Sequence, residues 1–478
     1  MSRTDYDAIV VGSGPNGLSA AITLQQHGKS VLLLEAKKQI GGGLRSEELT
    51  LPSFLHDVCS AVHPMASVSP FLNSLPLADY GVDFIFPEVS VAHPLDDGRA
   101  AVLTKSLEYT ASGLGADSHA YLDLMRPILK AWPKLSENIL SPLLRMPSHP
   151  KTMVKFGWLG LSSALSLSRR FKTTEAKALW AGMAAHSMQP LSKFTTSAVG
   201  LVLQATGHIK GWPIVIGGSR RIADALSSYF LSIGGEIETG IYIKSLSQLP
   251  SSKVVMFDVT PKQLLEIAGH RFSSIYQWQL KKFRYGMGIF KVDWALDAPI
   301  PFMSADARRA GTLHLGNTIH EIEASERAAH CGQHSQRPFV LLSQPSLFDY
   351  HRAPTGKHTA WAYCHVPKGS TVDMRDAIEK QVERFAPGFK DRILATHTFN
   401  TEQLEKYNPN YIGGDIGGGV MDIRQLFNRP ALFSPYRTGV KGMYICSSST
   451  PPGGGVHGMC GYHAARRALK DIFGINLK

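Results

Sequence analysis

A glycine-rich turn near the N-terminus constrains the fold more than any other part of the sequence. The apolar run Ala8–Val11 is typical of a buried parallel strand. It leads into Gly12, Gly14 and Gly17, which follow a G-x-G-x-x-G pattern, and a helical pattern starts by Leu18. Such glycines permit a tight turn, let a pyrophosphate approach the backbone and let the helix pack closely on the strand. The turn therefore predicts a dinucleotide site at the N-terminus of a helix.

An acidic residue follows the turn at the spacing of a ribose ligand. The apolar run from Ser30 to Leu34 ends at Glu35, 18 residues after Gly17. A carboxylate near this distance binds the ribose hydroxyls of a dinucleotide, so we expect this role for Glu35. The alternative is an ordinary strand–helix turn with a solvated Glu35. From the same stretch we also expect cofactor contacts by Ser13, Pro15, Asn16 and Ala36.

A second glycine run, Gly41–Gly43, comes shortly before Arg45. Consecutive glycines beside an arginine suit a backbone that wraps a cofactor, with the guanidinium on a phosphate or on the edge of a flavin ring. We therefore expect Gly42, Gly43 and Arg45 to contact the cofactor. The alternative is an ordinary flexible turn.

The end of the chain repeats the strand–glycine loop–helix arrangement. An apolar strand at Met443–Cys446 leads through Gly453–Gly455 to a helix from about Met459 to Phe473. A flavin needs such a second site, because its ring can lie at another helix N-terminus whose dipole stabilises negative charge on the reduced ring. This loop favours FAD over NAD and predicts cofactor contacts by Gly455, Val456 and His457.

The middle of the chain divides into stretches of different character. Residues 211–262 return to the nucleotide-binding pattern, with a helix at Arg221–Leu231, a hairpin-like strand at Gly240–Ile243 and another strand at Val254–Val259. From the hairpin-like strand we expect Ile243 to offer backbone groups to an adenine ring. Residues 263–432 show the alternation of half-buried antiparallel strands.

These patterns together predict an α/β fold with two domains. A Rossmann-like FAD-binding domain is assembled from three segments, 1–75, 211–262 and 433–478. The remaining segments, 76–210 and 263–432, form an α+β substrate domain with a mixed or antiparallel sheet and a basic helical lid.

Composition narrows the functional class further. The chain has 478 residues, 44% of them hydrophobic and 18% charged, which suits a globular protein of two or three domains. Its five cysteines form no C-x-x-C pair, so we expect neither a disulfide framework nor a dithiol flavoenzyme. We recognise no metal-ligand pattern and no nucleic-acid module. Because the first strand starts about six residues from Met1, we expect no targeting peptide and a cytoplasmic location, or an organelle matrix in a eukaryote.

The net charge of +12 is concentrated in one segment. Between Arg126 and Arg221 there are fourteen Lys and Arg residues against two Glu residues, which accounts for the whole excess. Within it, residues 150–172 place Trp158 and Phe171 beside basic side chains, which is typical of a helix at a membrane surface. We therefore expect peripheral membrane contact through residues 150–172. The alternative is a lid over the substrate cavity with its basic residues in water.

The two glycine loops together resemble those of the phytoene desaturase-like FAD oxidoreductases. The matching stretches are Val11–Leu18, Glu35, Gly41–Gly42, Gly217–Leu226 and Tyr444–Gly458. Four further stretches are similar to the branch named after pyridine nucleotide-disulfide oxidoreductase domain-containing protein 2: Gln344–Ser346, Ala353–His358, Gly414–Gly418 and Pro435–Thr438. The resemblance implies a non-covalent FAD, a three-segment Rossmann-like domain and, in carotenoid-processing members, peripheral membrane contact.

We therefore expect an FAD-dependent oxidoreductase that passes hydride between flavin N5 and a small hydrophobic substrate, as carotenoid desaturases do. Such an enzyme can work without a strong acid or base. Four residues are candidates if one takes part: His63, Asp57, Asp415 and His457. The alternatives are an FAD-dependent isomerase or amine oxidase, and a flavin-bound regulatory or partner-binding protein with little turnover. The substrate, the electron acceptor and the oligomeric state are not determined by these patterns.

Overall fold

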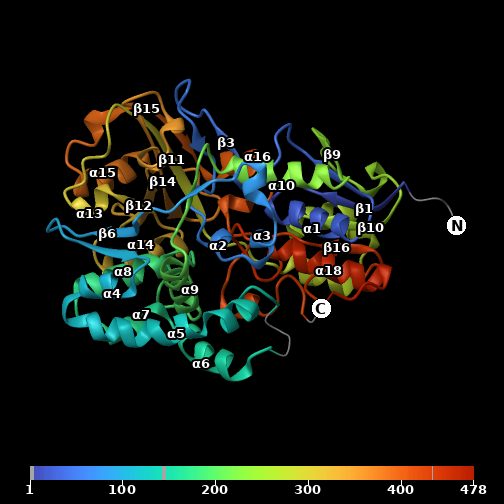
Figure 1. Ribbon diagram of the computed structural model, residues 1–478, viewed down its shortest axis with the longest axis horizontal. Coiled ribbons are helices and arrows are strands. Elements are labelled where there is room, and N and C mark those ends of the chain that lie inside the picture. The colour runs from blue at the N-terminus through green and yellow to red at the C-terminus, as the bar shows by residue number, and fades with distance from the viewer. Residues whose placement is uncertain (1–4, 143–146, 433, 478) are drawn as a thin grey trace.

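A five-stranded parallel sheet forms the centre of the nucleotide-binding part of the protein, on the right of Figure 1. The computed structural model describes residues 5–142, 147–432 and 434–477. The strand order is β16-β10-β1-β2-β9, and every pairing is parallel. The strands are β1 (Tyr6–Val11), β2 (Val31–Glu35), β9 (Glu236–Thr239), β10 (Ser252–Phe257) and β16 (Met443–Ile445). They come from three separate stretches of the chain, as the predicted fold class requires, while the exact domain boundaries stay predictions.

Helices cover both faces of this sheet, which explains why its first strand is a continuous apolar run. Ala8 and Val10 belong to one core with α1 (Pro15–Gln26), α10 (Arg220–Ser232) and α18 (Met459–Phe473). On the other face, the neighbouring strand residues form a second core with α11 (Pro261–Ala268) and α12 (Ser274–Lys281).

The first and last of these helices cross at very short distance. A Cβ added to Gly461 of α18 would lie 1.8 Å from the carbonyl oxygen of Asn16 in α1. Only glycine permits this approach. Helices α1 and α18, which are far apart in the sequence, therefore pack in close contact beside the first glycine loop. Figure 1 shows the two helices side by side against the sheet.

A seven-stranded mixed sheet forms the second domain, on the left of Figure 1. Its order is β15-β11-β14-β13-β12-β6-β7, with one parallel pairing, between β12 and β6. The strands are β6 (Val89–Pro94), β7 (Ala100–Thr104), β11 (Gly288–Leu296), β12 (Ala310–Leu315), β13 (Val340–Ser343), β14 (His358–Val366) and β15 (Ile393–Phe399). One face packs on α15 (Arg375–Phe385), and the other packs on helices in part and lines a cavity in part.

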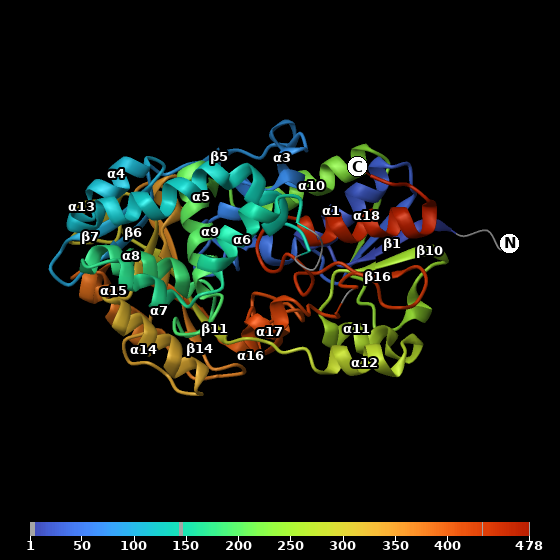
Figure 2. The ribbon, with the colours of Figure 1, turned by 90° about the horizontal axis from the view of Figure 1, so that it is seen from below.

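A helical layer lies at one end of the mixed sheet and extends toward the nucleotide-binding domain, as Figures 1 and 2 show. Its helices are α4 (Leu107–Ser112), α5 (Ser118–Ile139), α6 (Pro150–Gly160), α7 (Ala164–Leu167), α8 (Thr174–Ala185) and α9 (Thr196–Ile209). Their buried residues form one core with residues of the mixed sheet. Within the ranges that the structure describes, no helix is long and apolar enough to cross a membrane.

Shorter elements connect these layers. The remaining helices are α2 (Pro64–Ser67), α3 (Pro70–Asn73), α13 (Ala305–Arg308), α14 (Ile319–His330), α16 (Thr401–Tyr407) and α17 (Ile423–Leu426). Two small antiparallel pairs join β3 (Ser46–Glu47) to β4 (His56–Asp57) and β5 (Phe84–Ile85) to β8 (Ile214–Val215).

One predicted strand was wrong. The hairpin-like strand expected at Gly240–Ile243 is irregular, and the strand lies just before it, at β9. β9 pairs in parallel with β2, so no hairpin forms. The glycine at position 240 has φ +78°, which ends the strand rather than beginning one.

Candidate active site

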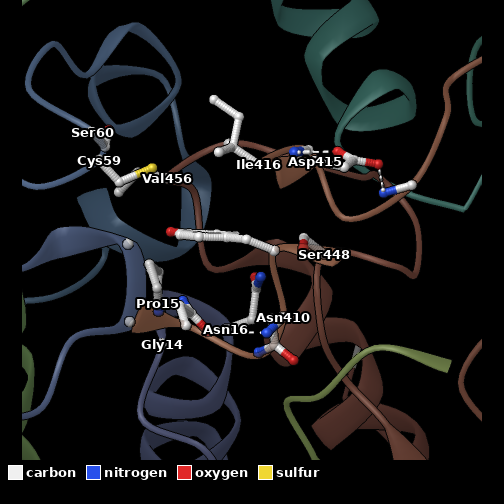
Figure 3. A pocket seen from close by; sticks show the side chains of 18 of the residues that line it. Gly14, Pro15, Asn16, Cys59, Ser60, Asn410, Asp415, Ile416, Ser448 and Val456 are labelled. Atoms are coloured by element: carbon white, nitrogen blue, oxygen red, sulfur yellow. Dashed lines mark hydrogen bonds between the residues drawn. The ribbon is translucent and has the colours of Figure 1, made fainter. Parts of the chain in front are cut away.

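A single cavity of about 1250 Å³ runs between the two domains. It extends from the N-terminal glycine loop, past the C-terminal loop, to the mixed sheet and the helical layer. This volume exceeds the roughly 300–1,000 Å³ of most ligand sites, so the cavity has room for a large cofactor together with a substrate. Figure 3 shows part of its wall, where Gly14–Asn16, Cys59–Ser60, Asp415–Ile416, Ser448 and Val456 surround the same space.

The first glycine loop has the geometry that its sequence predicts. Gly12 has φ +102°, a region that favours glycine. A Cβ on Gly17 would lie 2.0 Å from the carbonyl oxygen of Gly12, so the turn can close only with glycine at position 17. Gly14 precedes α1 as its N-cap residue. In the first turn of α1, Pro15 has no N–H and the Gly17 amide donates to Asp258, so the Asn16 amide and the positive end of the helix dipole are left for a phosphate.

Asp258, which sequence reasoning missed, lies directly beneath this loop. Its Oδ2 accepts a hydrogen bond of 2.9 Å from the Gly17 amide. A Cβ on Gly14 would lie 2.7 Å from the same oxygen. Burial raises the pKa of Asp258 to about 7, and the negative charge of Glu35 contributes to the increase. The residue follows β10 at the carboxyl edge of the parallel sheet, which is the signal that could have identified it.

Glu35 lines the cavity, and its carboxylate organises the glycine loop. One oxygen accepts hydrogen bonds from the backbone amide of Ser13 at 3.0 Å and from its hydroxyl at 2.5 Å. The other accepts from the Lys37 amide at 2.9 Å and forms an ion pair with Arg45 at 3.1 Å. Glu35 is therefore held at the end of β2, beside the loop, where the sequence places a ribose ligand.

The second glycine run packs against the first. Gly42 has φ +57°, and a Cβ on it would lie 2.9 Å from the Cα of Gly14. Gly43 leaves space for the hydroxyl of Tyr411, which a Cβ would approach to 2.8 Å. Arg45 also donates to the carbonyl of Gln39 and lies over the ring of Tyr407. The two glycine-rich stretches thus form one continuous backbone surface in the cavity wall.

The C-terminal loop reaches the same cavity. Gly454, Gly455 and Val456 line it. His457 does not: its Nδ1 accepts the Met459 amide at 3.0 Å, and its Nε2 contacts the Gly453 carbonyl oxygen at 3.2 Å. Burial lowers the pKa of His457 to about 4. The imidazole therefore connects the C-terminal loop to the first residue of α18, on the side of the loop away from the cavity.

Most of the residues predicted to contact the cofactor lie in the cavity wall. They are Gly12, Ser13, Gly14, Pro15, Asn16, Glu35, Ala36, Gly42, Gly43, Arg45, Ile243, Gly455 and Val456. Gly17 and His457 lie behind the wall, where the first closes the turn and the second supports the C-terminal loop.

Two of the catalytic candidates, Asp57 and His63, lie in a buried network behind the cavity. Asp57 accepts hydrogen bonds from the Ser46 hydroxyl and the Ser219 amide and pairs with Arg352 at 2.9 Å. Burial opposes its ionisation, but Arg352 and these hydrogen bonds lower the pKa of Asp57 overall. His63 contacts the Ser219 hydroxyl at 2.9 Å, and burial lowers its pKa to about 4. The network joins four separate stretches of the chain. Asp57 and His63 therefore have a structural role.

Asp415 does line the cavity, but its carboxylate is occupied. Its oxygens accept hydrogen bonds from the amides of Gly286 at 2.6 Å, Gly417 at 2.7 Å and Gly419 at 3.0 Å. Burial raises the pKa of Asp415. Arg429 supports the same glycine loop by donating to its carbonyl oxygens. Asp415 therefore shapes the loop, as the dashed hydrogen bonds in Figure 3 show.

The remaining wall of the cavity is formed by helices and by the mixed sheet. Apolar residues of α6 and α9 line one side, and they include Met153, Phe156, Ala198, Val199 and Val202. The sheet contributes Thr312, Leu341, Trp361 and Tyr363, and His186 follows α8. Sequence reasoning did not single out these sheet residues, because they face the cavity only through the pairing of distant strands. In the described part of the chain, no three or more His, Cys, Asp or Glu side chains are grouped to hold a metal ion.

Known proteins are similar to this chain in one domain and over nearly its full length. Residues 10–75 match the model of the NAD(P)-binding Rossmann-like domain. The chain is 26% identical to pyridine nucleotide-disulfide oxidoreductase domain-containing protein 2 of Mus musculus, over 98% of this chain and 94% of that protein. It is 29% identical to one of the subunits of limonene dehydrogenase from Castellaniella defragrans, over 98% and 95% of the two chains.

A solved structure of putrescine oxidase with bound putrescine has the same fold. It superposes with a TM-score of 0.62 at 16% identity and covers 98% of this chain and 99% of that one. The chain therefore carries an NAD(P)-binding Rossmann-like domain, and over nearly its whole length it is similar to pyridine nucleotide-disulfide oxidoreductase domain-containing protein 2.

Proposed function

We propose that this protein is an FAD-dependent oxidoreductase that acts on a small hydrophobic molecule by hydride transfer to or from flavin N5. The observation that carries the proposal is the single cavity, which begins at the dinucleotide loop and ends against the apolar faces of α6 and α9. A nicotinamide cofactor alone would leave the C-terminal glycine loop without a role.

The residues in the wall suit FAD. Gly14 and Gly42 lie so close that any side chain on Gly42 would fill the gap between their backbones. The first turn of α1 would offer the Asn16 amide and the helix dipole to a pyrophosphate, Glu35 would bind the ribose, and the C-terminal loop precedes α18. When bound, the flavin would supply a ring that accepts or gives up hydride.

The protein itself would contribute binding, orientation and exclusion of water. The apolar side chains of α6 and α9 cover the cavity on the side of the helical layer. The residues predicted as acids or bases are held in hydrogen bonds to the backbone or in buried pairs, so they stabilise loops. The arrangement fits a reaction in which the protein positions a carbon centre and excludes solvent.

The hydrophobic substrate class is supported by this lining and by the name of one relative, limonene dehydrogenase. An amine oxidase is the second candidate, because Trp361 and Tyr363 stack at 5.6 Å in the cavity wall and aromatic faces attract cationic amines. The fold of putrescine oxidase is compatible with this candidate.

Anaerobic photoreduction of the FAD-loaded protein tests the proposal. Mixing the reduced protein with oxygen or with a quinone should reoxidise the flavin; rapid reaction with oxygen indicates an oxidase, and preference for quinone indicates a dehydrogenase. Protein that retains no FAD, or reduced flavin that no acceptor reoxidises, would contradict the proposal. Putrescine and limonene, offered to the oxidised protein, then distinguish the amine candidate from the hydrophobic one.

We also propose that α6 contacts a membrane surface. Val154 and Trp158 are 73% and 85% exposed, while Phe156 of the same helix lines the cavity. Lys151 and Lys155 are exposed on the helix as well, which suits anionic lipid headgroups. One helix therefore joins the outer surface to the cavity, so a hydrophobic substrate could enter beside it.

A further inference from the structure

The sheet face of the cavity carries polar groups that a pure hydrocarbon would leave unused. Tyr363 of β14 and His314 of β12 lie in one cross-strand row, because both pair with Leu341 of β13. Tyr363 and Leu341 line the cavity, and so does His186, whose ring contacts His314. Tyr363 of the row and His186, which contacts His314 of the row, therefore bring a phenol and an imidazole to the same wall.

His186 and His314 form a neutral hydrogen-bonded pair. Their Nε2 atoms are 2.9 Å apart. Burial lowers the pKa of His186 to about 3 and holds the pKa of His314 well below its usual range. Since both rings are neutral, one Nε2 carries the hydrogen and the other accepts it.

The packing around His314 decides the direction of this bond. Its Nδ1 is buried without a hydrogen-bond partner among the described residues, and a Cβ on Gly182 would lie 2.5 Å from it. A buried N–H without an acceptor costs more than an unused lone pair. His314 therefore carries its hydrogen on Nε2 and donates it to His186. His186 then carries its own hydrogen on Nδ1, which, unlike Nδ1 of His314, is not among the fully buried atoms without a partner, and His186 lines the cavity.

Tyr363 supplies a second donor. Its ring stacks on Trp361 at an interplanar angle of 4°, which fixes its orientation, and burial raises the pKa of its hydroxyl, so the phenol stays protonated. No hydrogen-bond partner for this hydroxyl is present among the described residues. Three further polar atoms are buried without partners in residues of the same wall: Oγ of Ser187, Oγ1 of Thr312 and Nε1 of Trp361.

We propose that Tyr363 of this row and the adjoining His186 form a polar subsite in which Nδ1–H of His186 and the Tyr363 hydroxyl bind a neutral oxygen of the substrate, a carbonyl or a hydroxyl. The inference rests on the proposed function and narrows its substrate class to oxygenated hydrophobic molecules. The Nδ1–H of His186 only donates, so it disfavours a protonated amine, which has only hydrogens to offer, whereas the Tyr363 hydroxyl can donate or accept.

Carvone and limonene test the subsite, because they share one cyclic skeleton and differ by a carbonyl group. Binding to the FAD-loaded protein is measured by titration calorimetry and by the shift in unfolding temperature. The wild type should bind carvone about 10-fold more tightly than limonene, as two hydrogen bonds imply. Tyr363→Phe and His186→Phe should each reduce this preference about 3- to 10-fold without weakening limonene binding. Tyr350→Phe, at a residue that is 81% exposed, is the matched control.

Three results would overturn the subsite: no binding of carvone, equal binding of the two probes, or an unchanged preference in Tyr363→Phe protein that has the wild-type unfolding temperature. Carvone binding confined to flavin-free protein would also overturn it, because the two donors would then serve the cofactor. The FAD content of each sample, read from the absorbance of released flavin, tests the proposed function separately.

Discussion

The Asp258 carboxylate lies beneath the dinucleotide loop with its Oδ2 2.9 Å from the Gly17 amide nitrogen. The same oxygen fills the space that a side chain at Gly14 would need. An acidic side chain therefore lies beneath a loop that is expected to bind an anion. The protonation of Asp258 should consequently affect the free energy of unfolding.

Stability should depend on pH through Asp258. Its pKa is about 7 in the folded protein against 3.8 ordinarily, so the folded state binds the proton more tightly than the unfolded state. This contribution is complete below about pH 4 and is lost as the pH rises to 7, with a total of about 4 kcal/mol. In urea unfolding across this range, wild-type protein should lose stability relative to Asp258→Asn. Parallel pH profiles for the two proteins would refute the prediction.

Glu35→Gln should weaken FAD binding about 10- to 100-fold, because one charge-assisted hydrogen bond contributes about 1.5–3 kcal/mol. Fluorescence titration of the apoprotein with FAD measures the dissociation constant. Glu238→Gln, an exposed carboxylate on neighbouring β9, is the control and should bind as the wild type does. Equal affinity in Glu35→Gln and wild type would remove the ribose role from Glu35.

Arg352→Met should destabilise the whole fold. The guanidinium pairs with Asp57 at 2.9 Å and with Asp349 at 2.8 Å, and all three side chains are fully buried. Removing it takes away the guanidinium that neutralises both buried carboxylates, at a cost of about 3–5 kcal/mol in the free energy of unfolding. Arg337→Met, at an exposed arginine, should change stability little. A loss below about 1 kcal/mol at Arg352 would contradict the structural role of this network.

Membrane contact through α6 can be measured with anionic liposomes. Replacing Val154 and Trp158 together by alanine should lower binding more than 10-fold, since burying each apolar side chain contributes about 1.5–3 kcal/mol. Trp278→Ala is the matched control, because this tryptophan is 56% exposed on α12. If wild-type protein does not cosediment with the liposomes, or if the control variant loses as much binding, α6 is a cavity lid without a lipid partner.

The sequence alone was sufficient to predict features that depend on neighbouring residues. Backbone geometry and periodicity, which adjacent residues determine, located the loop at Gly12–Gly17, the strand ending at Glu35 and the helix Met459–Phe473. The failed strand at Gly240–Ile243 shows the limit of this approach, since alternation alone could not distinguish a strand from the turn that ends one.

The residues behind and around the cavity depend on contacts between distant segments. Asp258 meets Gly17 across 241 positions of the chain. Tyr363 and His314 share a row only through the register of β12, β13 and β14. His63 and Asp57 were candidate catalytic residues because they follow the cofactor loop closely in the sequence. In the structure Ser219 contacts His63 and Arg352 pairs with Asp57, so both side chains belong to a buried network behind the cavity wall.

The crossing of Gly461 and Asn16 has a consequence for how the protein is made. Translation produces the dinucleotide loop long before α18, the helix that packs behind it. Nascent chains would therefore present an incomplete site until α18 has been made. Cofactor loading should follow the synthesis of this helix, and a chain that stops before α18 should be released without cofactor.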